Sequence, residues 1–332
     1  MQLPPDLRAA LEDVLGETRA SHLKVSAADI SRRYRTPKQP NLPALRSAED
    51  VVAYVAVRLP ATYAAVRHGL RQTLAAVPDG VPATQLDVGA GPGTAAWAAV
   101  ATWPGLGAIT LVERDPEVIS IGRRLAARAS AGPLREARWL REDLRRLSPP
   151  AAHDLVTAAY VLGELDLDVQ DRLVARLWQA SRGLLVLVEP GTPAGFARIR
   201  RARAQLLGLG AQVAAPCPHD EECPMADGDW CHFAQRLERS ALHRRSKDAE
   251  LGHEDEKFSY VAASRWPVRR AEGRVLRHPQ VRQGHVRLEV CGPHGLRSEV
   301  VARSDGRRYR LAKDLAWGEA MPSPGSEEEE PN

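Results

Sequence analysis

A glycine-rich turn constrains the fold of this 332-residue chain more than any other feature of its sequence. The turn lies in "LDVGAGPGTAAWAA", where Gly89, Gly91 and Gly93 follow a short apolar run and precede a segment of helical pattern. Glycines between a strand and a helix let a ligand approach the backbone closely. A dinucleotide-binding fingerprint places its third glycine three residues after the second, and here the interval is two. The turn therefore predicts a cofactor site of another kind.

The segments around this turn alternate between strand and helix patterns. The strand candidates are the apolar runs "TQLDVGA", "AITLVERD", "HDLVTAAYVL" and "GLLVLVEPG". Strands that alternate with helices form parallel βαβ units. We therefore expect an α/β fold with a doubly wound, mostly parallel, Rossmann-like sheet.

The spacing of Asp87 and the three glycines resembles the first motif of class I S-adenosylmethionine-dependent methyltransferases. In that resemblance Glu113, at the end of the second strand, accepts hydrogen bonds from both ribose hydroxyls of the cofactor. Asp143 in "REDL" lies near the adenine. The alternative reading is a turn that serves packing alone.

The reaction itself is not specified by the sequence. Amino-group methyltransferases that act on bases carry an Asn/Asp-Pro-Pro-aromatic motif after the fourth strand, where this chain has "AAYV". C5-pyrimidine enzymes need a cysteine nucleophile there, and no cysteine lies between Thr84 and Pro216. Tyr160 and Glu164 are the candidate catalytic residues, and a structural role for both is the alternative.

Three of the four cysteines, Cys217, Cys223 and Cys231, stand in "APCPHDEECPMADGDWCHF", and Cys291 is remote. Clustered cysteines in a reducing compartment are more often metal ligands or redox groups than disulfide partners. His219 and His232 admit a Cys₃His or Cys₄ zinc site, but tight Cys-x₂-Cys pairs are absent. The looser spacing suits a four-iron cubane. A polar loop without metal is the third alternative.

The domain organisation follows from changes in residue pattern. We expect a helical N-terminal region (1–82) with a helix kinked or divided at Pro60, and a methyltransferase-like domain (83–264) with a cysteine-rich insertion (211–252). Within this domain, "FAQRLERSALHRRSKDAELG" is helix-prone and "KFSYVAAS" is a late strand. A small β module (265–318), which includes "RRYRLAK" as a strand, precedes a disordered acidic tail (319–332).

Positive charge is concentrated near the C-terminal end. Between Arg265 and Lys313 there are 13 Lys or Arg and 4 Asp or Glu residues, so 13 − 4 gives a balance of +9. Such a basic face predicts a polyanionic partner, with RNA contacted by Arg277, Arg282 and Arg287. The alternative is an arginine-rich surface in contact with solvent alone.

Targeting and membrane signals are missing from the sequence. No signal peptide follows Met1, and no run of about 18 apolar residues occurs. We expect a cytoplasmic, monomeric protein that does not enter a membrane.

Several motifs together resemble a known family. "AYVAVRLPATYAAV", "DVGAGPGTAAWA", "VEPGTPAGFARIRRAR", "APCPHDEECPM", "DWCHF" and "KFSYVAASR" occur in the order of the mitochondrial small-ribosomal-subunit methyltransferase-like family and its bacterial relatives. The resemblance covers roughly residues 45–315. It implies a class I methyltransferase fold, association with small-subunit ribosomal RNA or the subunit precursor, and a role in assembly of that subunit.

The same resemblance bears on the cofactors. It implies a four-iron, four-sulfur cluster on Cys217, Cys223, Cys231 and Cys291, together with S-adenosylmethionine at the glycine turn. Two functions follow: a small-subunit assembly factor that binds ribosomal RNA and both cofactors, with methylation of ribosomal RNA left open, or a catalytically inactive RNA-binding scaffold with structural zinc in place of the cluster.

Overall fold

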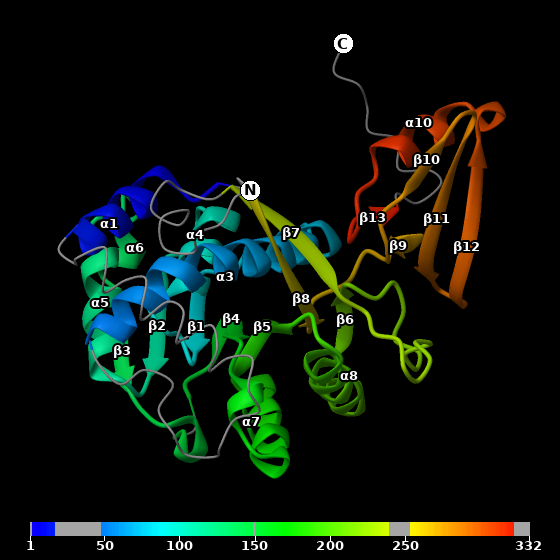
Figure 1. Cartoon of the computed structure of the whole chain (residues 1–332). Coiled ribbons are helices and arrows are strands. Elements are labelled where there is room, and N and C mark those ends of the chain that lie inside the picture. The colour runs from blue at the N-terminus through cyan, green and yellow to red at the C-terminus, as the bar shows by residue number, and fades with distance from the viewer. Residues whose placement is uncertain (1, 17–47, 149, 239–252, 322–332) are drawn as a thin grey trace.

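The computed structural model describes residues 2–16, 48–148, 150–238 and 253–321, and within them it forms two β-sheets (Figure 1). The larger sheet has the strand order β3-β2-β1-β4-β5-β8-β6, with β7 paired to β8. Its strands are β1 (Thr84–Val88), β2 (Ala108–Glu113), β3 (Arg138–Arg141), β4 (His153–Ala159), β5 (Ser181–Pro190), β6 (Gln212–Ala215), β7 (Phe233–Glu238) and β8 (His253–Ser264).

Strands β1 to β5 run parallel to one another, whereas β8 is antiparallel to both β5 and β6. This order and these directions confirm the Rossmann-like α/β fold of a class I methyltransferase. The glycine turn follows β1, the central position at which the order of the strands reverses.

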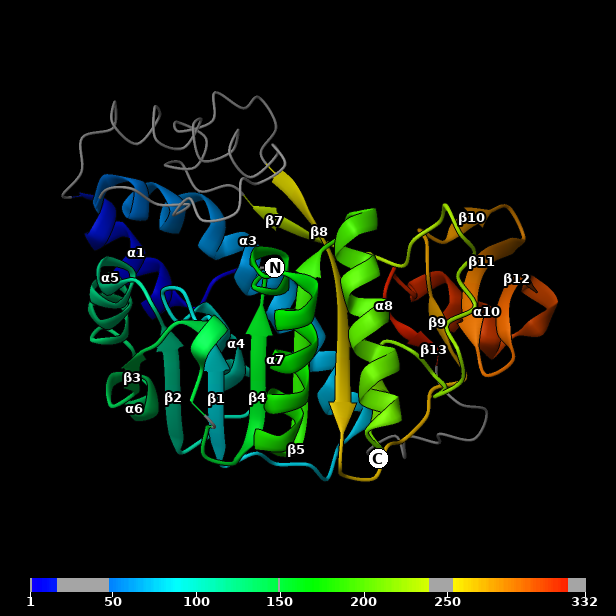
Figure 2. The ribbon, with the colours of Figure 1, turned by 90° about the horizontal axis from the view of Figure 1, so that it is seen from below.

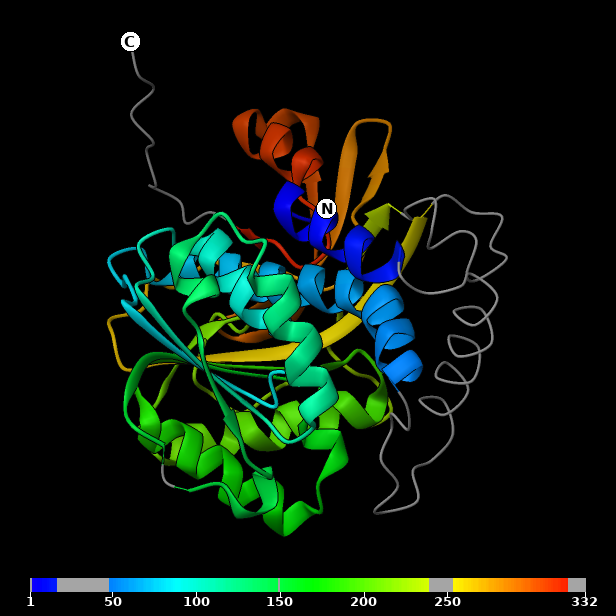
Figure 3. The same ribbon diagram turned by 90° about the vertical axis from the view of Figure 1, so that its left-hand side faces the viewer.

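Helices cover both faces of this sheet, so the domain has three layers (Figures 2 and 3). Helices α1 (Pro5–Gly16), α3 (Ala48–Ala76), α4 (Thr94–Thr102) and α5 (Pro116–Ala126) share one hydrophobic core, and α7 (Leu167–Ala180) and α8 (Pro193–Gly208) share the other. Along β5, Leu184 and Val186 face the first core while Leu185 and Leu187 face the second. This alternation is the period of two that a strand buried on both sides requires.

The second sheet contains β9 (Gly273–Val275), β10 (Gln280–Arg282), β11 (His285–Gly292), β12 (Gly295–Ala302) and β13 (Ala320–Met321). It has its own small core, which includes Val286, Leu288 and Val301. Strand β13 lies at the start of the range expected to be a disordered tail, and residues 322–332 lie outside the described part of the chain.

Two predicted elements have the wrong secondary structure. "RRYRLAK" is not a strand but helix α10 (Arg307–Asp314), because Tyr309, Ala312 and Leu315 recur at helical spacing and pack on the second core. Residues 233–238 are not helical but form β7, because pairing with β8 buries Phe233 and Leu237. The remainder of that predicted helix, 239–252, lies outside the described residues.

Other expected elements are found where the sequence places them. Strand β8 contains the predicted "KFSYVAAS", and α8 contains the basic helix that precedes the cysteines. Pro60 lies inside α3 and does not divide it. Strand β6 belongs to the main sheet, so the cysteine-bearing segment begins after Ala215 rather than at residue 211.

Packing at the junction of β5 and α8 can be tested at Gly195. A Cβ there would collide with the carbonyl oxygen of Pro190, whereas a Cβ on Gly208 of the same helix meets nothing within 4 Å. We expect Gly195→Ala to lower the free energy of unfolding by ~1–3 kcal/mol. Gly208→Ala should leave it unchanged or raise it by up to ~1 kcal/mol. Urea denaturation of both variants measures the difference, and equal stabilities would contradict this packing.

Candidate functional site

The glycine turn has the backbone geometry that its sequence predicts. Gly89, Gly91 and Gly93 have φ values of +67°, +55° and +84°, in the left-handed region where side chains are strained. A Cβ on Gly89 would also collide with Val161, while the space around Gly91 is open. The backbone of the turn is therefore accessible at Gly91.

Glu113 binds this turn directly. One carboxylate oxygen accepts a hydrogen bond from Gly91 N at 3.0 Å, and the other accepts from Arg114 N and Asp115 N at 2.8 and 3.0 Å. Burial raises the pKa of Glu113, and these hydrogen bonds oppose that rise. Asp143 lies beyond β3, where its side chain accepts from Arg145 N at 2.9 Å. Both predicted cofactor residues are thus fixed at the ends of neighbouring strands.

Asp87 lies below the turn and is 1% exposed. One carboxylate oxygen accepts from the Thr157 hydroxyl at 2.8 Å, and the other is buried without a recorded hydrogen-bond partner. Burial raises the pKa of Asp87 to about 7, with Glu113 adding to the rise and the Thr157 hydrogen bond opposing it. Asp87 therefore connects β1, the strand that leads into the turn, to Thr157 of β4.

The raised pKa of Asp87 makes stability depend on pH. Because the folded protein holds this proton more tightly than the unfolded chain, stability decreases as the pH rises from 3.8 to about 7. The gap between these pKa values corresponds to at most ~4 kcal/mol. We expect Asp87→Asn to remove this loss, so that its melting temperature relative to wild type rises between pH 4 and pH 8.

The matched control for this measurement is Asp168→Asn. A hydrogen bond from Arg172 lowers the pKa of the exposed Asp168, so the sign there is opposite and the effect is small. A melting-temperature difference for Asp87→Asn that does not change with pH would contradict the role assigned to this carboxylate.

Tyr160, the first residue after β4, belongs to a partly buried polar network. Its φ of +61° is left-handed, and its hydroxyl donates to Glu256 at 3.0 Å. Arg58 of α3 donates to both oxygens of Glu256 at 3.2 and 2.9 Å and lies 5.7 Å from the centroid of the Tyr160 ring. Burial raises the pKa of Tyr160 well above its usual value. Glu164 lies 4.0 Å from a guanidinium nitrogen of Arg114. Tyr160 and Glu164 thus contact different charged partners, Glu256 and Arg114.

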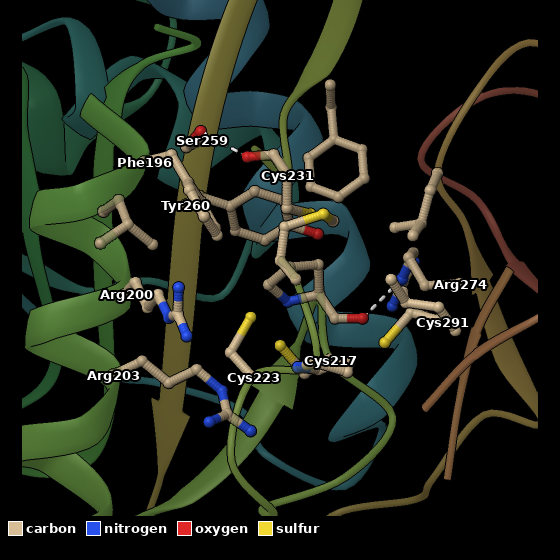
Figure 4. Close-up of a pocket in the computed structure, with 17 residues that line it drawn as sticks. Phe196, Arg200, Arg203, Cys217, Cys223, Cys231, Ser259, Tyr260, Arg274 and Cys291 are labelled. Carbon is tan, nitrogen blue, oxygen red and sulfur yellow. Dashed lines mark hydrogen bonds between the residues drawn. The ribbon is translucent and has the colours of Figure 1, made fainter. Parts of the chain in front are cut away.

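The four cysteines line a single cavity between the two sheets (Figure 4). Cys217, Cys223 and Cys231 lie in the one loop between β6 and β7, and Cys291 comes from β11 of the second sheet. The empty space within the cavity and its open mouth together is about 570 Å³. The remaining lining residues are Phe196, Ile199, Arg200, Arg203, Pro216, Pro224, Met225, Phe233, Ser259, Tyr260, Arg274, Leu276 and Leu296.

Burial disfavours negative charge on these sulfur atoms. It raises the pKa of Cys291 to about 12, and it raises the pKa of Cys217 and Cys231 as well, with repulsion between the cysteines adding to each rise. The thiols of Cys217, Cys231 and Cys291 are therefore neutral at physiological pH unless a cation compensates them. Among the described residues, no group of three or more His, Cys, Asp or Glu side chains has the arrangement of a metal site.

The two histidines of this segment differ in position. His219 is buried, and its Nε2 lies 3.5 Å from the sulfur of Cys291. His232 is equally buried, contacts the carbonyl of Trp230 and stacks on that indole ring, and neither histidine is among the residues that line the cavity. His219 is thus the histidine that can join the cysteines.

Sequence reasoning missed the arginines of this cavity. Arg200 and Arg203 come from α8, and Arg274 comes from β9, directly across the ladder from Cys291. The basic pattern of the helix "FARIRRARAQ" was visible in the sequence, but its spatial relation to the cysteines was not.

The three arginines expected to bind RNA have different surroundings. Arg277 donates to both carboxylate oxygens of Asp229 at 2.7 and 3.0 Å. Arg287 donates to the Ser298 hydroxyl at 3.0 Å and lies 3.4 Å from a carboxylate oxygen of Glu289. Arg282 is exposed, and no ion pair is recorded for it in the described part of the chain. Only Arg282 of the three thus presents a charge without a recorded counter-ion.

Comparison with protein families gives one match over most of the chain. Residues 48–322 match the family described as "Mitochondrial small ribosomal subunit Rsm22". The chain belongs to the Rsm22 family. This membership and the sheet order agree with the fold and family that the sequence motifs indicate.

Curated relatives extend the comparison. The chain is 31% identical over 295 residues to human "Ribosome assembly protein METTL17, mitochondrial", covering 82% of this chain and 62% of that protein. It is 28% identical over 384 residues to "Rsm22-cox11 tandem protein 2, mitochondrial" of Schizosaccharomyces pombe, covering 95% of this chain and 50% of that protein. The Rsm22-family chain thus spans between half and two thirds of the length of these relatives.

Two methyltransferases are among the solved structures that the chain resembles. Magnesium protoporphyrin IX methyltransferase (ChlM) from Synechocystis with bound SAH has a TM-score of 0.42 and 12% identity, over 74% of this chain and 97% of that one. Human N-acetylserotonin methyltransferase in complex with SAM has a TM-score of 0.43 and 14% identity, over 80% of this chain and 72% of that one.

In the described residues, no helix has the length and apolar character to cross a membrane.

Proposed function

We propose that this Rsm22-family chain is an assembly factor of the small ribosomal subunit that binds S-adenosylmethionine and holds a four-iron, four-sulfur cluster on Cys217, Cys223, Cys231 and Cys291. Its partner is small-subunit ribosomal RNA or the subunit precursor, and it acts as a cytoplasmic monomer. Family membership and the name of the human relative support the assembly role. The cysteine-lined cavity is the observation that carries the proposal.

The composition of the cavity fits a thiolate-ligated centre. All four cysteines line it, and none of its described lining residues is Asp or Glu. Soft thiolate ligands select iron–sulfur clusters or zinc over hard cations, which carboxylates prefer. When bound, a cluster supplies a redox-sensitive cross-link among the chain segments that carry its ligands.

A scaffold with structural zinc is the second candidate. The contact of 3.5 Å between His219 Nε2 and the sulfur of Cys291 favours it, because a histidine near the thiols allows a Cys₃His set. The two candidates differ in colour, iron content and sulfide content, so they are separable on purified protein.

The cluster proposal predicts the colour of the protein and its loss on mutation. Protein purified without oxygen should be brown and contain iron and inorganic sulfide. Cys217→Ser and Cys291→Ser should each remove most of the absorbance, because each removes one ligand. Met225→Leu, which changes a buried lining residue while conserving volume, is the control and should retain the colour. Colourless wild-type protein with one zinc per chain would contradict the cluster and support the zinc scaffold.

Cofactor binding at the glycine turn is supported by its left-handed glycines and by the contact between Glu113 and Gly91 N. Methyl transfer has weaker support, because the Tyr160 hydroxyl already donates to Glu256 in a partly buried network. We therefore propose that the cofactor serves assembly in the first place, with methylation of ribosomal RNA as the activity to be tested.

Gly91→Asp tests the cofactor site. The new carboxylate would lie beside Glu113 on a left-handed backbone, so we expect the dissociation constant for S-adenosylmethionine to rise at least tenfold, ~1.4 kcal/mol. Gly210→Asp is the matched control, because Gly210 is also left-handed and surrounded by open space but lies after α8. Calorimetric titration of both variants measures the change. Equal affinities would contradict a cofactor at this turn.

The same variant separates enzyme from scaffold in cells. Methylation maps of small-subunit ribosomal RNA are compared between wild-type and Gly91→Asp strains. One lost mark that purified protein restores supports methyl transfer. Unchanged maps together with defective small subunits support the scaffold.

RNA binding is proposed on the exposed arginines of the second sheet. Arg303 N donates to the Gly284 carbonyl oxygen at 2.8 Å, which places Arg303 next to the turn after Arg282. Arg307 and Arg310 of α10 are exposed as well, and no ion pair is recorded for these four side chains in the described residues. Such a group suits the phosphate backbone of RNA.

Salt dependence measures this surface. We expect affinity for a small-subunit ribosomal RNA fragment to fall steeply with salt, and Arg282→Gln to reduce the slope of log K against log salt by about 1. Arg277→Gln should have a smaller effect because Asp229 already neutralises that charge. Arg172→Gln on α7 is the control. Affinity that does not vary with salt would contradict the RNA surface.

A further inference from the structure

Two buried arginines in the cysteine cavity have no part in the function proposed above. Arg203 is 4% exposed and Arg274 is 3% exposed, and both line the cavity with the four cysteines. Figure 4 shows Arg203 on the same side of the cavity as Cys217 and Cys223, and Arg274 next to Cys291. Arginine keeps its proton in proteins, so both positions are positively charged.

Arg203 holds the loop that carries the first two cysteines. Its terminal nitrogen donates to the carbonyl oxygens of His219 at 2.9 Å and Glu221 at 2.7 Å. Its Nε is buried without a recorded hydrogen-bond partner. The guanidinium therefore orders the loop and interacts with the Cys217 thiol, while its Nε–H has no recorded partner.

Arg274 connects this loop to the second sheet. Its Nε donates to the Pro216 carbonyl oxygen at 2.8 Å, and a terminal nitrogen donates to the Gly318 carbonyl oxygen at 3.0 Å and to the side-chain amide oxygen of Gln72. All of these acceptors are neutral. The same residue is the cross-strand neighbour of Cys291.

Within the ranges that the structure describes, no carboxylate balances these two charges. In the described part of the chain no ion pair is recorded for Arg203 or Arg274, and a buried charge without a counter-ion is strongly unfavourable. The described cavity residues able to become negative are the four cysteines and Tyr260, and burial raises the pKa of the Tyr260 hydroxyl. The positive charge of Arg203 and Arg274 lowers the pKa of Cys217 and Cys291, although burial outweighs this effect. Four thiolates around a dipositive centre carry a net charge of −2, which two arginines balance.

We propose that Arg203 and Arg274 are the counter-cations of the metal centre, and that Arg203 Nε donates a hydrogen bond to one of its sulfur atoms. This inference rests on the function proposed above. The two arginines act as positioning residues: they hold the cysteine loop and its contact with the second sheet, and they stabilise the negative charge of the occupied site. Loss of the metal leaves both cations uncompensated. Occupancy of the metal site and the contact of the second sheet with the cysteine loop are therefore coupled through Arg274.

Neutralising Arg203 tests the proposal through metal retention. Arg203→Gln in the metal-loaded full chain should release iron to a chelator at least tenfold faster than wild type, and the charge-conserving Arg203→Lys should lie between them. Arg200→Gln is the matched control, because Arg200 lies on the same helix and lines the same cavity but is partly exposed and screened by solvent. Its release rate should stay within about twofold of wild type. Equal rates in Arg203→Gln and Arg200→Gln overturn the proposal.

Reduction potential gives a readout that a merely structural role would not move. The reduced centre carries one more negative charge, so removing a nearby cation disfavours it. We expect Arg203→Gln to lower the ratio of reduced to oxidised centre at a fixed potential at least tenfold, ~59 mV for a one-electron couple. Arg203→Lys should restore most of this shift. A potential equal to that of wild type in Arg203→Gln overturns the proposal.

A comparison of metal-loaded and metal-free protein controls for misfolding. Arg203→Gln should lower the melting temperature of the metal-loaded form more than that of the metal-free form, where the cation is uncompensated. An equal decrease of the melting temperature in both forms would assign Arg203 a role in loop structure alone and overturn the inference. Wild-type protein that holds no metal overturns the proposed function as well, so the two failures are distinguishable.

Discussion

The pairing of β8 with its neighbours is the constraint on which the rest of the structure depends. This strand lies antiparallel between β5 and β6 and also carries β7. Its Glu256 reaches Arg58 and Tyr160 on the side of the glycine turn, and its Ser259 hydroxyl donates to the Cys231 carbonyl oxygen at 2.7 Å. One strand therefore fixes residues at both candidate sites. A shift of its register by one residue would move each of these side chains to the opposite face.

The cysteine cavity is the second consequence of this pairing. Strands β6 and β7 are the elements that flank the cysteine loop, and both depend on β8 for their hydrogen bonds. Cys291 reaches the same cavity from the second sheet, where it pairs with Arg274. A centre held by all four cysteines would thus connect the methyltransferase-like sheet to the second sheet. In this account the metal contributes to the placement of the RNA-binding surface and takes no direct part in methyl transfer.

The sequence predicted the parts of the molecule that depend on local pattern. The glycine turn and Glu113 follow from a strand–turn–helix motif, and the main sheet follows from apolar runs that alternate with helices. The secondary structure predicted for the residues of α10 and β7 was wrong, because it depends on contacts with distant segments. One such contact is the pairing of Phe233 with Phe258. The roles of Arg203, Arg274 and Glu256 were not predictable for the same reason. Charge pattern reveals that arginines are present, but it does not reveal which of them are buried beside thiols.

Hydrogen–deuterium exchange of metal-loaded and metal-free protein tests the central claim most directly, because it reports on both sheets at once. The account predicts that amides of the cysteine loop (217–231) and of β11 lose protection together when the metal is removed, while β1, β4 and β5 keep theirs. A loss confined to the cysteine loop, or no loss in either segment, would contradict a centre that holds the two sheets together.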